Sequence, residues 1–323
     1  MEISEAKKQV IKAGIELSKN GLIARTWGNV SCRTDDGHFV ITASGRNYIT
    51  LTEDEVIEVS MEDLGYDGDI KPSSEKKIHR EVYRMKENAA FVIHTHQSNA
   101  SAVSAMGLPG VKLDKDYPGI GNFVFCADYG LPGTKKLCRN TAAALNEYDG
   151  KAVIMSNHGA LCYGSSYEEA FEIAETLEEA CGIFLENIGV PSWKKEDFIA
   201  GKEENEKEPL WNSDPSIMKF MDIRDVLRPY LDDFAQLAGT GIKVTDYDEE
   251  KINKALTEKK PLLVRGKGAL CVAEKKSDAE ALSIVIEKNC RAALAAIGRK
   301  PINHVECMMM RQLYLKKYSK RSE

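Results

Sequence analysis

The chain has 323 residues, of which 43% are hydrophobic and 29% charged, and its formal net charge is -6. This is the profile of a globular protein with one large or two modest domains. Charge is spread along the chain without a basic stripe, so we expect neither nucleic-acid nor membrane binding. The eight cysteines form no C-x-x-C pair, and no signal-peptide core is found, so we expect reduced thiols and a cytoplasmic protein.

The N-terminal part alternates between predicted helices and short β-rich segments. A first helix ends at Asn20-Gly21, and "ARTWGNVSCR", "GHFVITASG" and "DEVIEVSM" then predict antiparallel strands joined by turns. A helix follows in "KPSSEKKIHREVYRM", and "AAFVIHTH" and "KAVIMS" are typical of buried strands. The sequence therefore predicts an α/β domain over residues 1–192, with a mixed sheet flanked by helices.

The C-terminal part contains a second, weaker copy of one segment. Residues 193–214 are charged and interrupted by Pro and Gly, which indicates a linker. Residues 262–290 align without gaps on 153–181, an offset of 109, and share an unbroken Gly-Ala-Leu-Cys run. We interpret 215–323 as a smaller α/β partial repeat, although a shared strand-turn-helix template could produce part of the similarity.

Three of the six histidines follow predicted core strands. His94 and His96 are two positions apart in "FVIHTH", so their side chains project from one face of the strand. His158 follows "KAVIM" and precedes a glycine that permits a tight turn. Three imidazoles suit a catalytic zinc with one open position. From spacing alone, a metal site and a set of structural histidines are about equally favoured.

Several small polar residues lie in predicted loops near these histidines. Glu75 begins a helix, where its carboxylate is either an ordinary first-turn acid or part of a site. Five residues have the composition of an anion-binding loop cluster: Asn29, Ser44, Gly45, Ser73 and Ser74. His79 could support Glu75, but a surface position on the helix is the expected one.

Five blocks of the sequence resemble the class II aldolase/adducin family, in the same order. They are "GLIARTWGNVSCR", "ITASGRNYITLTEDEVIEVS", "KPSSEKKIHREVYR", "FVIHTHQSNASAVSA" and "VIMSNHGALCYGSSYEEAF", and they cover roughly residues 3–190. The resemblance implies a three-layer α/β/α domain with a central, mainly antiparallel sheet. It also implies a homo-oligomer, usually a cyclic tetramer with active sites between subunits.

The resemblance also assigns roles to individual residues. It implies that His94, His96 and His158 bind one Zn²⁺ per chain, or another divalent metal, and that Glu75 is the catalytic base. It places a substrate phosphate among Asn29, Ser44, Gly45, Ser73 and Ser74, with Thr26 beside them.

Three departures from the family pattern stand out. Ala43 replaces the usual proline of that loop. The catalytic tyrosine that family aldolases carry on a C-terminal tail cannot be placed here, and Tyr117 is only a weak match to another family tyrosine. Residues 228–239 fall roughly where a second His-x-His strand and its helix would be, without histidines, and Lys267 replaces the third. We expect this region to lack a metal site and to pack on the first domain or replace a subunit contact.

The resemblance implies a zinc-dependent aldolase that cleaves or forms a carbon–carbon bond in a small ketose phosphate of the fuculose or rhamnulose type. The metal would stabilise negative charge on an enediolate while Glu75 moves a proton. Dehydration or 4-epimerisation on the same site is the first alternative, and a non-enzymatic, adducin-like binding module is the second.

Overall fold

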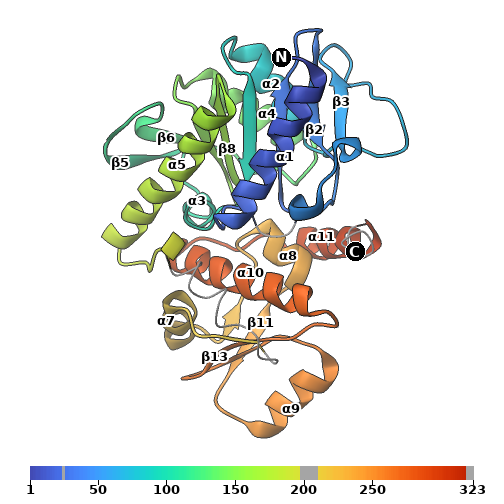
Figure 1. Ribbon diagram of the computed structural model, residues 1–323. Helices are drawn as coiled ribbons and strands as arrows, with labels where there is room; N and C mark the ends of the chain where they lie inside the picture. Colours follow the sequence, from blue (N-terminus) through green and yellow to red (C-terminus); the bar gives the residue numbers. More distant parts are fainter. Residues whose placement is uncertain (24–25, 197–209, 318–323) are drawn as a thin grey trace.

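The chain forms two β-sheets of different size. The computed structural model describes residues 1–23, 26–196 and 210–317. An eight-stranded sheet occupies the upper part of the view in Figure 1 and a five-stranded sheet the lower part, with α8, α10 and α11 at the level between them.

The larger sheet is mainly antiparallel. Its order is β3 (Val56–Ser60), β2 (His38–Thr42), β1 (Gly28–Arg33), β4 (Phe91–Thr95), β8 (Gly159–Gly164), β7 (Ala152–Met155), β6 (Gly121–Ala127) and β5 (Gly110–Tyr117). Only β6 and β7 pair in parallel among these neighbours. The burial pattern explains the central position of β4, because all five of its residues are buried and it is covered on both faces.

Helices cover both faces of this sheet and make three layers. One hydrophobic core joins the sheet to α1 (Ile3–Lys19), α3 (Ser98–Ser104) and α5 (Tyr167–Asn187). A separate core on the other face includes α2 (Lys76–Met85) and α4 (Lys135–Asn146). Two 3₁₀ turns, η1 (Tyr48–Thr50) and η2 (Glu53–Glu55), precede β3. The predicted α/β/α arrangement is confirmed.

The smaller sheet belongs to the C-terminal part. Its order is β10 (Val226–Leu227), β11 (Ile242–Thr245), β12 (Leu262–Val264), β13 (Gly268–Cys271) and β9 (Leu210–Asn212). Its helices are α7 (Pro215–Ile223), α8 (Asp232–Ala238), α9 (Glu249–Glu258) and α10 (Lys276–Ala295), and α11 (His304–Lys317) follows.

The pairing of this sheet repeats half of the larger one. β11 and β12 are parallel, and β13 then pairs antiparallel with β12 and β9, as β6, β7, β8 and β4 do. The hairpin register is also the same, since Leu262 pairs with Leu270 as Val153 pairs with Leu161. This supports the interpretation of a partial repeat, which we retain as a proposal.

The strand pairing corrects two expectations about the C-terminal part. Trp211 of β9 pairs with Leu270 as His94 pairs with Leu161, so β9 is the counterpart of the His-x-His strand. Residues 228–239 instead form a loop and α8. β9 lies inside the predicted linker because three residues are too short to give a strand pattern in a charged segment. Residues 197–209 of that linker lie outside the described part of the chain.

The long helix α10 joins the two parts. Arg291 has 0% exposure and donates a hydrogen bond from Nη1 to Ser98 Oγ of α3 at 2.7 Å. Lys288, also buried, donates from Nζ to the carbonyl oxygen of His96 at 2.9 Å. The expected packing of the C-terminal part on the first domain is therefore seen directly.

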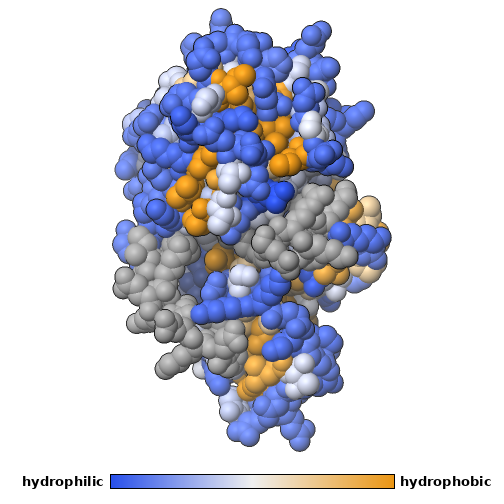
Figure 2. Space-filling view, turned by 45° about the vertical axis from the view of Figure 1, so that its right-hand side comes forward, coloured by the Kyte–Doolittle hydropathy of each residue, from blue (hydrophilic) through white to orange (hydrophobic). Residues whose placement is uncertain are grey.

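The face seen in Figure 2 is mostly hydrophilic and the cysteines are free thiols, as the composition and the cysteine spacing predict. Figure 2 shows a mostly hydrophilic face with separate hydrophobic patches. All eight cysteines are free thiols, and all but Cys138 are buried. Within the described ranges, every helix falls short of the length and apolar character that crossing a membrane requires.

Candidate metal centre

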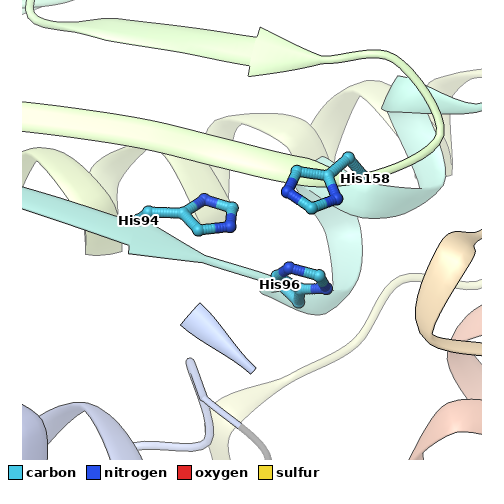
Figure 3. A group of neighbouring side chains, drawn as sticks. All are labelled: His94, His96 and His158. Carbon is cyan, nitrogen blue, oxygen red and sulfur yellow. The ribbon is translucent and has the colours of Figure 1, made fainter. Parts of the chain in front are cut away.

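Three histidines meet where strand β4 of the larger sheet ends and its neighbour β8 begins. His94 lies in β4 and His96 just beyond it, and both rings point toward His158, which lies in the turn between β7 and β8 (Figure 3). The ring centroids are 4.5 to 5.0 Å apart. One nitrogen from each ring falls in a group whose members lie within 4.8 Å of one another. The structure therefore brings the predicted ligands together.

The turn that carries His158 depends on its neighbours. Asn157 adopts a left-handed backbone with φ of 59°, a conformation that asparagine tolerates better than most residues. A Cβ atom on Gly159 would lie 2.2 Å from the carbonyl oxygen of Thr95. Glycine is therefore required there, because β8 approaches the His-x-His strand closely.

The Nε2 atoms of His94 and His158 are positioned to bind an ion. His94 Nδ1 lies 2.8 Å from the carbonyl oxygen of Ala160 and donates to it, which leaves Nε2 with a lone pair. Among the described residues, His94 Nε2, His158 Nε2 and Glu75 Oε1 are buried without a hydrogen-bond partner. Both histidine Nε2 atoms lie 3.2 Å from an oxygen of Glu75. Nitrogen and oxygen donors of this kind fit a divalent metal.

The electrostatics of these groups also favour a cation. Burial opposes ionisation of Glu75, but His158 and His94 outweigh it and hold the pKa of Glu75 well below its usual value. Burial likewise opposes a charged His158, yet Asp232 and Glu75 raise its pKa well above the usual value. The pKa of His94 is lowered, chiefly by burial. Positive charge is thus stabilised between Glu75 and Asp232.

A buried network orients Glu75. Glu75 precedes α2, and its Oε2 accepts a hydrogen bond from Asn29 Nδ2 at 3.1 Å. Asn29 Oδ1 accepts one from His79 Nε2, and Ser31 Oγ lies 2.6 Å from His79 Nδ1. His79 has 0% exposure, and burial lowers its pKa to about 3. The expectation of a surface histidine was wrong, because α2 turns this side chain toward β1 of the sheet.

The predicted phosphate-binding residues line one cavity of about 380 Å³ together with Glu75, His96 and His158. They are Thr26, Asn29, Ser44, Gly45, Ser73 and Ser74. A bridge between Ala43 and Pro72 holds their two loops side by side, and Ser73 N–H donates to the carbonyl of Thr42 at 3.0 Å. Alanine at position 43 is therefore compatible with this loop arrangement.

Further residues of the cavity wall are not predicted from the sequence. Gly133 and Thr134 extend the polar side at the start of α4. Met309, Met310, Leu313 and Tyr314 of α11 supply an apolar side, and Asp232 and Gln236 come from α8. No motif marks these residues, and those of α8 and α11 approach the cavity only through the packing of the C-terminal part.

Tyr117 does not line this cavity. It lies at the end of β5, the edge strand of the sheet, and its hydroxyl donates to Asp114 Oδ1 at 2.8 Å. Within this chain, β8, β7 and β6 separate β5 from the His-x-His strand, so a role for Tyr117 in the site stays a prediction.

Comparison with known proteins agrees with the geometry. The sequence profile of the Class II Aldolase and Adducin N-terminal domain matches residues 8–185. The chain belongs to this family. It is 30% identical over 202 residues to a 5-deoxy-D-ribulose 1-phosphate aldolase of Bacillus thuringiensis, covering 61% of this chain and 93% of that protein. It is also 30% identical over 192 residues to an L-fuculose phosphate aldolase of Escherichia coli, covering 59% of this chain and 87% of that protein.

A solved structure supports the assignment of the first domain to the class II aldolase fold. An L-fuculose 1-phosphate aldolase superposes with a TM-score of 0.53 at 28% identity, over 63% of this chain and 98% of that one. The predicted family and fold are confirmed, and the relatives are named as aldolases, which supports the prediction of a metal-dependent class II aldolase. The residues beyond 185 fall outside the family profile.

Proposed function

We propose that the chain cleaves or forms a carbon–carbon bond in a small ketose phosphate and binds one zinc ion, with another divalent metal as the alternative. One observation carries the proposal: His94, His96 and His158 converge, and His96, His158 and Glu75 line a cavity whose other wall offers hydroxyl and backbone donors. Two relatives named as aldolases of deoxy-ketose phosphates support a phosphorylated sugar as the substrate.

Each group has a distinct chemical task. A divalent metal held by the three histidines would act as a Lewis acid on the oxygen atoms of the substrate. Glu75 would transfer a proton, and Asn29 keeps its carboxylate directed at the cavity. The loops around Ser44 and Ser73 would bind the phosphate and provide binding energy remote from the reacting bond.

Metal content is the first test. Elemental mass spectrometry on the tag-free full chain should find about one zinc ion in wild type and little in His96→Ala. The loaded wild type should then release an aldehyde from one of a panel of ketose phosphates, and Glu75→Gln should slow this release by about 10² to 10⁴-fold.

The possible results separate the alternatives. A wild type without transition metal after zinc supplementation would favour the binding module over the enzyme. Bound zinc with substrate turnover but no aldehyde would favour dehydration or epimerisation. The homo-oligomer, a tetramer by family resemblance, and the cytoplasmic location stay predictions.

A further inference from the structure

Two aspartates at the start of α8 contact two of the three histidines. Asp232 Oδ2 accepts a hydrogen bond from His158 Nδ1 at 2.6 Å, and Asp233 Oδ2 lies 3.4 Å from His96 Nδ1. The two aspartates have only 1% and 0% exposure. A carboxylate bound to the outer nitrogen of an imidazole fixes its tautomer, directs the other nitrogen outward and strengthens it as a metal ligand.

Other hydrogen bonds determine where these carboxylates point. Asp232 Oδ1 accepts the N–H of Asp233 at 2.8 Å, and Asp233 Oδ1 accepts the N–H of Phe234 at 2.7 Å. The other oxygen of each faces a histidine, and Asp232 Oδ1 also lies 3.7 Å from His96 Nδ1. The backbone N–H of Asp232 also donates to the carbonyl of Asn157 at 3.1 Å, so α8 is bonded directly to the β7–β8 turn.

Helix α10 holds this arrangement from behind. Lys288 forms a buried ion pair with Asp233 and also contacts the backbone of His96. Asn289 Oδ1 accepts the N–H groups of Tyr230 and Leu231 at 2.8 and 3.0 Å, which fixes the loop leading into α8. The positions of both aspartates therefore depend on a helix that lies outside the family-matched region.

The helix that carries the aspartates is an addition to the repeated frame. In the larger sheet, β5 and β6 are joined by a short turn between Tyr117 and Gly121. In the smaller sheet, the corresponding strands β10 and β11 are joined by the segment that contains α8. This insertion leaves its own sheet and reaches the histidines of the other.

We propose that the C-terminal part completes the metal centre. Asp232 is a positioning residue that holds His158 with Nε2 directed at the ion, and Asp233 supports His96 through a longer contact. This inference rests on the proposed metal function, and it makes metal affinity depend on residues beyond the family domain.

The test is the zinc affinity of full-length Asp232→Asn, measured by competition with a chromophoric chelator. We expect the dissociation constant to rise about 10- to 100-fold. Asp246→Asn is the matched control, since Asp246 is 92% exposed, and its affinity should equal that of wild type. If Asp232→Asn binds zinc as tightly as this control, the positioning role is refuted while the proposed metal function stands. A wild type that binds neither zinc nor another divalent metal refutes both.

A second measurement needs no variant and covers the case that Asp232→Asn fails to fold. Nitrogen-15 NMR of zinc-loaded wild type should show His158 protonated at Nδ1 and metal-bound at Nε2. A His158 ring that is protonated at Nε2 would overturn the inference.

Discussion

The two sheets of this molecule share a backbone frame but carry different side chains at equivalent positions. In the larger sheet, His94 and His158 are buried with their rings stacked at a centroid distance of 4.8 Å. In the smaller sheet, Trp211 takes the place of His94 and Lys267 that of His158, and Lys267 Nζ lies 4.2 Å from the Trp211 ring centroid. A cation–π contact at the surface thus occupies the position of a candidate metal centre.

The difference shows that the strand-turn-helix frame does not by itself make a site. The larger sheet adds β1 and α2, which provide Asn29 and Glu75, and the smaller sheet has no counterpart of them in the described residues. The two frames also use their long helices differently. Lys288 of α10 is buried against the first domain, whereas Glu179, at the equivalent position of α5, is exposed. The second copy supports the site of the first instead of forming its own.

The largest expected effect comes from giving the first copy the side chain of the second. His158→Lys should lose most of the bound metal and with it the proposed cleavage activity, because it replaces an imidazole with an ammonium group that has no lone pair. The new charge can pair with Glu75 and Asp232, so we expect the variant to fold. Metal content by elemental mass spectrometry is the measurement.

Lys267→His provides the matched control for that variant. It restores a histidine in the second copy, but Trp211 stays in place and the turn remains exposed, so no second metal ion should bind. If Lys267→His bound two metal ions per chain, a single histidine in the second copy would be enough for a site, and the prediction would be wrong.

Sequence patterns predicted the parts of the molecule that depend on local or regular spacing. The i, i+2 spacing placed His94 and His96 on one face, and the glycine after His158 marked a tight turn. Ser166 is the observed cap of α5, and the local Ser-x-x-Glu spacing of Ser166 and Glu169 is typical of such a helix start. The strand β9 was missed because its three residues become a strand only by pairing with β13.

The remaining contacts of the site depend on residues far apart in sequence. In the sequence alone, Asp232 and Asp233 are typical of acids in the first turn of a helix, and Lys288 is typical of a lysine within a helix. Their role follows from the packing of α10 on α3, which brings charges to a buried surface that the hydrophobic pattern of α10 does not mark. His79 was misassigned for the same reason, because its partners Asn29 and Ser31 lie on another element.

The second prediction concerns the contrast between the two long helices. Lys288→Met should lower the free energy of unfolding by about 3–5 kcal/mol, because it leaves the buried carboxylate of Asp233 without its ion-pair partner. Lys254→Met is the control, since this lysine is 71% exposed, and its effect should stay below about 0.5 kcal/mol. Urea unfolding with a chelator present excludes any contribution from bound metal.

A double variant sharpens this result. Lys288→Met combined with Asp233→Asn removes both charges and keeps an acceptor for the N–H of Phe234, so it should recover part of the lost stability. No recovery would mean that Lys288 stabilises the interface through its packing and its bond to the His96 carbonyl, and not through the ion pair.

The smallest effect is expected where the two long helices begin. Ser166 Oγ accepts the N–H of Glu169 at 3.2 Å and caps α5, whereas the equivalent residue of α10 is Lys275, whose ammonium cannot accept a hydrogen bond. Ser166→Ala should therefore lower the free energy of unfolding by about 1 kcal/mol. Ser277→Ala makes the same chemical change at an exposed position in the first turn of α10 and should cost less than about 0.5 kcal/mol. Equal losses in the two variants would show that the serine cap does not distinguish the starts of these helices, and that packing alone sets where each one begins.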